Sequence, residues 1–233
     1  MFKLVSFLIC IFVFNLYATD GALEAFKKKD YKNAFELYSK NAKSGKSTAQ
    51  NALSYLYFNG LGVNRDAKKG IFWLKKAAGQ ADMVAQYDLA MMYLSGNNVK
   101  QDYKKAFFWL QRASDLGSVD AKYNLALMHY QGNATKIDVK KCVELLEDIA
   151  QKGHVKAKEN IGRIYMQLLD FDKAVYWLEK NASQNDVEAY YLLAEVYCSQ
   201  EKFSDAKKWA KKSIENGNLT AKELWKKYNL KKY

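Results

Sequence analysis

The feature that most constrains this chain is a pattern that recurs along nearly its whole length. An alanine marks each copy, and successive copies lie 36, 36, 36, 32 and 32 residues apart. The marking residues are Ala49, Ala85, Ala121, Ala157, Ala189 and Ala221. A period in this range is typical of helix pairs that stack into a solenoid, because one pair cannot bury its apolar face alone. The sequence therefore predicts an all-α fold of stacked antiparallel helix pairs.

Each copy also repeats the pattern of its own side chains. In the first helix, apolar residues stand at offsets 0, 4, 7 and 8 from the marking alanine, which is one helical face. Offset 5 always carries a small residue, which lets the partner helix approach closely. The second helix has tryptophan at one position in four of five copies, namely Trp73, Trp109, Trp177 and Trp209. We expect these rings in the core, and expect Trp109→Ala to cost roughly 3–5 kcal/mol.

The spacing divides the chain into consecutive helix pairs. An abbreviated first pair is expected at about 21–29 and 31–43, with Thr19 capping its first helix. Further pairs are expected at 49–83, 85–118, 121–154, 157–186 and 189–218, with a closing helix from Ala221. The last two copies lose four residues from the loop between their helices, so the repeat changes from 36 to 32 residues at about residue 156.

Two copies carry a resemblance to a known family. The pattern LSYLYFNGLGVNRDAKKGIFWLKKAA at 53–78 resembles a Sel1-like repeat, a relative of the tetratricopeptide repeat, and LAMMYLSGNNVKQDYKKAFFWLQRAS at 89–114 is similar. The resemblance extends over essentially all of residues 19–233. It implies a right-handed α-solenoid, a Sel1-like or tetratricopeptide-like superhelix. The two short copies have tetratricopeptide spacing, since twelve residues separate Gly162 from Ala174.

The first eighteen residues predict a secretory signal peptide rather than part of the fold. Lys3 precedes an apolar run from Leu4 to Leu16, and Ala18 is a small residue suited to cleavage. The run is short for a membrane span. We therefore expect a periplasmic or secreted protein cleaved after Ala18. Leu16, at the third position before the cut, is a poor match, so an uncleaved anchor stays open as an alternative.

The charge of the chain argues against a nucleic-acid partner. The formal net charge is +12, but it comes from 34 lysines and three arginines. Proteins that read bases and phosphates favour the arginine fork, and these lysines are spread along helices as doublets. We expect no nucleic acid, and only weak contact with an anionic membrane or the cell wall.

The sequence offers little that would support catalysis. Cys142 and Cys198 lie two repeats apart, so we expect two unpaired thiols rather than a disulfide. His129 and His154 are the only histidines, and no spacing suggests a metal site, a catalytic triad or a cofactor. We therefore expect no cofactor and favour a protein that is not an enzyme.

The family resemblance supplies the alternative function. Exported cysteine-rich Sel1-like proteins are associated with penicillin binding and β-lactamase activity, but this chain lacks their cysteine pairs. Ser-x-x-Lys, the nucleophile motif of such enzymes, begins at Ser199 and at Ser204. Two matches are expected by chance in so lysine-rich a chain, and neither has the accompanying Ser-Asp-Asn or Lys-Thr-Gly motif.

The main functional prediction is an interaction surface on the first helices. If these line the concave side, offsets 2, 6 and 9 face a partner. The predicted binding residues are Asn51, Tyr55, Phe58, Tyr87, Met91, Leu94, Tyr123, Leu127, Tyr130, Arg163 and Tyr191, with Glu159, Met166, Glu195 and Cys198 at the corresponding positions of the last two repeats. Tyrosine suits peptide contacts because it offers a large area with little rotamer entropy to lose. The leading hypothesis is an exported monomeric scaffold that binds a polypeptide. The alternative is that these residues only pack against neighbouring helices.

Overall fold

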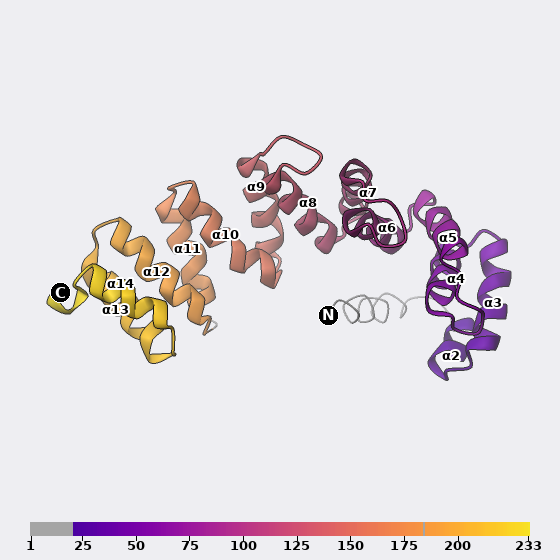
Figure 1. Ribbon diagram of the computed structural model, residues 1–233, viewed down its shortest axis with the longest axis horizontal. Coiled ribbons are helices and arrows are strands. Elements are labelled where there is room, and N and C mark those ends of the chain that lie inside the picture. The colour runs from indigo at the N-terminus through magenta and orange to yellow at the C-terminus, as the bar shows by residue number, and fades with distance from the viewer. Residues whose placement is uncertain (1–20, 184) are drawn as a thin grey trace. The chain divides into compact units, whose positions relative to one another are not determined.

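Figure 1 shows the computed structural model of the protein, which describes residues 21–183 and 185–233. These residues form thirteen α-helices and one short 3-10 helix, with no strand among them. In chain order they are α2 (Gly21–Lys27), α3 (Tyr31–Lys43), α4 (Ser47–Asn59), α5 (Ala67–Gly79), α6 (Met83–Ser95), α7 (Tyr103–Asp115), α8 (Val119–Gln131), α9 (Val139–Gln151), α10 (Val155–Gln167), α11 (Phe171–Ala182), α12 (Val187–Ser199), α13 (Phe203–Glu215), α14 (Leu219–Lys227) and η2 (Leu230–Lys232). Each helix packs on the next along the chain within its unit, which confirms the predicted all-α arrangement of helix pairs.

The helices form two compact units that divide between Leu116 and Gly117. The first unit holds α2 to α7 and the second holds α8 to η2, and each has its own buried core. The division falls between two helix pairs, whereas the change of repeat length near residue 156 lies inside the second unit. The predicted signal peptide, residues 1–18, and the predicted cap Thr19 lie outside the described residues.

Every first helix begins two residues earlier than the marking alanine suggested. In five of these six helices the cause is the N-cap, which stands three positions before that alanine and whose side chain accepts its backbone N–H. The exception is α4, whose N-cap Lys46 makes no side-chain hydrogen bond. The Asp82 carboxylate accepts from the Ala85 amide at 2.9 Å, and the Ser118 hydroxyl accepts from the Ala121 amide at 3.2 Å. The marking alanine is therefore the third residue of its helix, and in the five capped helices both its burial and its amide fix its position.

The loops within the helix pairs explain the two repeat lengths. The pairs of period 36 have seven-residue loops at 60–66, 96–102 and 132–138, and the later pairs have three-residue loops at 168–170 and 200–202. The long loop after α4 packs against the start of α3. A Cβ on Gly62 would lie 2.0 Å from the Tyr31 carbonyl oxygen, and Gly62 has φ +70°, so only glycine fits there.

The core consists of small residues and leucines more than of tryptophans. The marking alanines are all at most 4% exposed. Gly162 approaches α11 so closely that a Cβ would lie 2.6 Å from Leu178, as expected for the small residue at offset 5. The tryptophan prediction holds fully only for Trp177, which is 2% exposed. The other three rings, of Trp73, Trp109 and Trp209, are only partly buried.

Candidate functional site

The first-helix face of the first unit is formed by α4 and α6. We use this name for the exposed side of α4 and α6 that carries Asn51, Tyr55, Phe58, Tyr87, Met91 and Leu94. All six side chains are partly buried, so each presents part of its surface to solvent.

Two rings of this face also make contacts inside the unit. The Tyr55 ring meets the Phe26 ring of α2 edge to face, with centroids 6.0 Å apart. The Phe58 ring covers Gly70 of α5, where a Cβ would lie 2.7 Å from it. Phe58 therefore packs within its own helix pair, and the N-terminal pair closes one end of the face at Tyr55.

The structure adds Asp88 to this face, a residue that the sequence pattern did not single out. Asp88 follows Tyr87 on α6 and is partly buried. Burial, and secondarily the charge of Asp82, raises the pKa of the Asp88 carboxyl from 3.8 to about 7. The sequence could have indicated Asp88, because it is the one charged residue among the residues of α4 and α6.

In the second unit the predicted tyrosines join consecutive first helices to one another. The Tyr123 hydroxyl accepts a hydrogen bond from the Asn160 amide at 2.8 Å, and its ring lies 5.0 Å from the imidazole of His154. The Tyr130 hydroxyl donates to the Gln167 side chain at 2.8 Å. These bonds tie α8 to α10, which is the packing alternative for these positions. Leu127 lies on the same helix and is partly buried.

The last predicted positions also make contacts between first helices. Arg163 of α10 donates to the Glu188 carboxylate of α12 at 2.9 Å, with both side chains about half exposed. Tyr191 is partly buried, and burial raises the pKa of its hydroxyl. Cys198 is only 3% exposed, so its thiol does not reach the surface. Consecutive first helices also pack directly on one another here, since α12 contacts both α10 and α14.

The thiols and the Ser-x-x-Lys motifs show no arrangement for catalysis. Cys142 and Cys198 are free and buried, and burial raises the pKa of each thiol to about 11, which disfavours the nucleophilic thiolate. The Ser199 hydroxyl donates to the Glu195 carbonyl at 3.0 Å rather than to its motif lysine. Lys207, the lysine of the second motif, donates to the Lys231 carbonyl at 3.4 Å. Nothing here favours the β-lactamase alternative.

Within residues 21–183 and 185–233, no group of three or more His, Cys, Asp or Glu side chains is placed to hold a metal ion. Over the same part of the chain, no helix combines the length and the apolar character needed to cross a membrane.

The stacked helix pairs define a helical-repeat protein related to tetratricopeptide arrays. The chain belongs to the Sel1 repeat family. The family pattern matches six times, at residues 21–46, 47–82, 84–118, 119–154, 159–186 and 187–218. None of the curated proteins searched gives a match.

Solved structures show the same relationship. A Sel1 repeat protein from Oxalobacter formigenes is 28% identical, with a TM-score of 0.72 over 88% of this chain and 87% of that one. A protective antigen of uropathogenic Escherichia coli with an SLR fold is also 28% identical, with a TM-score of 0.64 over 80% of this chain and 42% of that one. A chain in the structure of Naa15/Naa10 bound to HypK-THB is 14% identical, with a TM-score of 0.56 over 89% of this chain and 32% of that one, and it shares the fold alone.

Proposed function

We propose that this protein is an exported scaffold that holds a partner polypeptide against its first-helix face. Its Sel1 and tetratricopeptide-like repeat fold is of a kind that binds protein partners. The observation that carries the proposal is the near absence of charge on this face. Among the thirteen residues of α4 none is charged, and among the thirteen of α6 only Asp88 is.

The chemistry of the face suits an extended polypeptide with apolar side chains. Tyr87 and Met91 stand one helical turn apart on α6 and remain partly exposed. Tyrosine gives a rigid contact area, and methionine adapts to the shape of what it meets. Asp88 supplies one carboxylate beside them, so we expect the partner to place a basic side chain there.

In the second unit the predicted binding residues have a structural role. Tyr123, Tyr130 and Arg163 already bond to neighbouring first helices, so moving them would cost existing contacts. We assign these residues to holding α8, α10 and α12 in register. Recognition is assigned to the first unit because α4 and α6 carry almost no charge.

The test begins with a photo-crosslinking amino acid at Leu94, which would identify the polypeptide that lies on α6. The affinity of that polypeptide is then measured for Tyr87→Ala/Met91→Ala and for Phe108→Ala. Phe108 is a matched control, because it is a large apolar residue of the same unit that is 49% exposed on a second helix.

We expect the double variant to lose roughly tenfold or more in affinity, since well-packed interface anchors carry most binding energy. Phe108→Ala should bind as the unchanged protein does. A double variant that keeps its helical circular dichroism and its full affinity would remove recognition from the first-helix face.

Export is a separate part of the proposal, supported by Lys3, the apolar run from Leu4 to Leu16, and Ala18. The check is the intact mass of the protein recovered outside the cytoplasm. A mass short by residues 1–18 agrees with cleavage after Ala18, and a protein found only in the cytoplasm would contradict export.

A further inference from the structure

The second helix α5 carries a stripe of exposed cations around one exposed ring. Lys68, Lys69, Phe72, Lys75 and Lys76 are all exposed, and their spacing of one, four, seven and eight residues places them along one side of the helix. Phe72 is 51% exposed, and the Lys76 ammonium lies 5.0 Å from the centroid of its ring. No acidic residue occurs anywhere in α5.

The second helix of the next repeat presents the same stripe. Its positions hold Lys104, Lys105, Phe108, Gln111 and Arg112, all exposed. Phe108 is 49% exposed, and the Arg112 guanidinium lies 5.5 Å from the centroid of its ring. The two stripes belong to consecutive repeats of one unit, so they repeat the same pairing of a phenyl ring with a cation.

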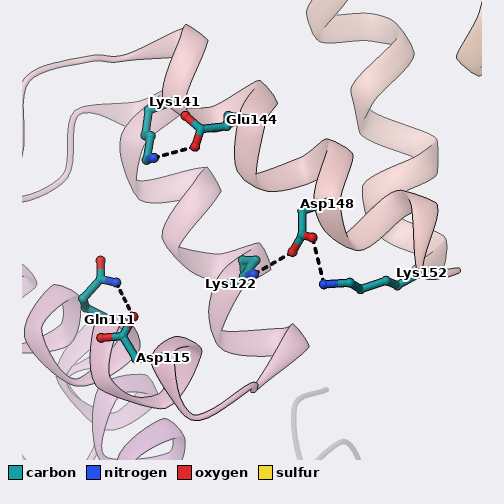
Figure 2. Close-up of polar contacts among 7 residues, drawn as sticks. All are labelled: Gln111, Asp115, Lys122, Lys141, Glu144, Asp148 and Lys152. Carbon is teal, nitrogen blue, oxygen red and sulfur yellow. Dashed lines mark hydrogen bonds and ion pairs between the residues drawn. The ribbon is translucent and has the colours of Figure 1, made fainter.

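The second unit does not continue this pattern. At the equivalent positions of α9 the ring is replaced by Glu144, and two further positions are Glu147 and Asp148. Figure 2 shows that Lys141 pairs with Glu144, while Asp148 binds both Lys122 and Lys152.

These ion pairs largely neutralise the α9 stripe. In α11 the positions are also mixed in sign, with two acidic residues, two lysines and a tyrosine. In α13 three lysines are present, but a lysine replaces the ring and an aspartate joins them.

We propose that the stripes of α5 and α7 dock the first unit on an anionic lipid surface. Lysine attracts anionic headgroups as a compact charge on a flexible stem, and exposed phenyl rings can enter the apolar edge of the headgroup layer. Seven exposed side chains carry a cation, counting six lysines and Arg112. Two of the lysines are paired with the aspartates that cap their own helices, Lys69 with Asp66 at 3.4 Å and Lys105 with Asp102 at 3.0 Å, which leaves five cations outside these pairs.

A protein partner fits these stripes less well than lipid does. Protein interfaces are depleted in lysine, and fixed recognition of a carboxylate favours the arginine fork, whereas six of the seven cations here are lysines. The stripes also share no residue with the first-helix face, so lipid docking and polypeptide binding can be tested separately.

The direct test is lysine acetylation of the full chain with and without vesicles. One set of vesicles is phosphatidylcholine alone, and the other contains phosphatidylglycerol in equal part. The apolar residues 4–16 are the same in both samples, so the difference between vesicles reports the anionic surface. We expect Lys68, Lys75 and Lys104 to be protected only by the phosphatidylglycerol vesicles, and Lys140 to stay reactive.

Matched variants give a second, independent readout. Lys68→Gln/Lys69→Gln removes two charges from α5, and Lys140→Gln/Lys141→Gln removes the same two from the equivalent positions of α9. With about fivefold per lysine near an anionic membrane, the α5 variant should lose roughly 25-fold in vesicle binding at low salt. The α9 variant should lose little. Phe72→Ala/Phe108→Ala should also weaken binding, because half-exposed rings can be removed without opening the core.

Three results would overturn the proposal. One is protection that is equal on the two kinds of vesicle. Another is an α9 variant that loses as much vesicle binding as the α5 variant. That result would mean that the net charge of the protein, and not the α5 and α7 stripes, determines binding. The third is binding to poly-glutamate with none to the phosphatidylglycerol vesicles, which would assign the stripes to an acidic polypeptide.

Discussion

Tryptophan occupies one position in four repeats, but its surroundings differ from repeat to repeat. Trp177 is 2% exposed, whereas Trp109 is only partly buried and lies beside exposed Phe108. Trp177→Ala should therefore lower the free energy of unfolding by about 3–5 kcal/mol, because it would leave a cavity between helices. Trp109→Ala should cost about 1–2 kcal/mol, since water already reaches its ring. Denaturant unfolding of both variants measures this, and equal losses would contradict the difference in burial.

Asp88 should make the stability of the protein depend on pH. Its folded pKa is about 7 and its ordinary value is 3.8, so between these pH values the folded protein keeps a proton that the unfolded chain releases. Stability should therefore fall as pH rises from about 4 to about 7, by about 2–4 kcal/mol. Asp88→Asn, which stays neutral, should be more stable than the unchanged protein at pH 8.

The two proteins should unfold alike near pH 4, where Asp88 is protonated in the folded state. Thermal unfolding at both pH values supplies the comparison. Asp82, whose pKa is also raised by burial, leaves some slope in both proteins, so the difference between them is the quantity to follow. A constant difference across this pH range would show that folding does not raise the pKa of Asp88.

At the scale of a loop, Gly62 shows how the loop of one repeat packs against the preceding repeat. Its φ is +70°, and a Cβ would meet the Tyr31 backbone at 2.0 Å, so both the loop and the start of α3 would have to move. Gly45 is the matched control, because it has φ +96° and open space around it. Gly45→Ala should cost about 1–2 kcal/mol from backbone strain alone. Gly62→Ala should cost at least about 1 kcal/mol more. Chemical denaturation tests this, and equal costs would deny the contact.

The helix pairs could be predicted because their signals repeat in phase. Small residues and leucines recur at fixed offsets, and packing requires the same sizes in every copy. The helix starts were placed two residues late because the caps share a position but not a residue type, as Asp82, Ser118 and His154 show. Because aspartate, serine and histidine can all cap a helix, the capping position does not show up as a repeated residue type in the sequence.

The sequence could place side chains along the first helices, but it could not predict their hydrogen bonds. The offsets identified which side chains lie along the first helices. They could not show that Tyr123 accepts from Asn160, because the residue at that offset differs between copies. The same position holds Asp88 in the second full repeat, where it becomes a carboxyl of raised pKa. Packing determines the residues that recur at fixed offsets. The residues that vary between copies determine the hydrogen bonds and the charge of each repeat.

At the scale of the whole molecule, the two compact units should respond separately to damage in their cores. In repeat proteins each element contacts only its neighbours, so stability is held locally. Leu146 belongs to the core of the second unit and Leu53 to that of the first, and both are at most 1% exposed. Replacing either by alanine should cost about 2–5 kcal/mol.

We expect the loss to stay within the unit that carries the substitution. Hydrogen exchange measured by mass spectrometry would then show faster exchange in α8 to α14 for Leu146→Ala, with α2 to α7 unchanged. Leu53→Ala, the reciprocal control, should do the reverse. Accelerated exchange spread evenly over residues 21–233 in either variant would mean that the chain opens as one cooperative block. In that case the division at residue 116 would have no energetic counterpart.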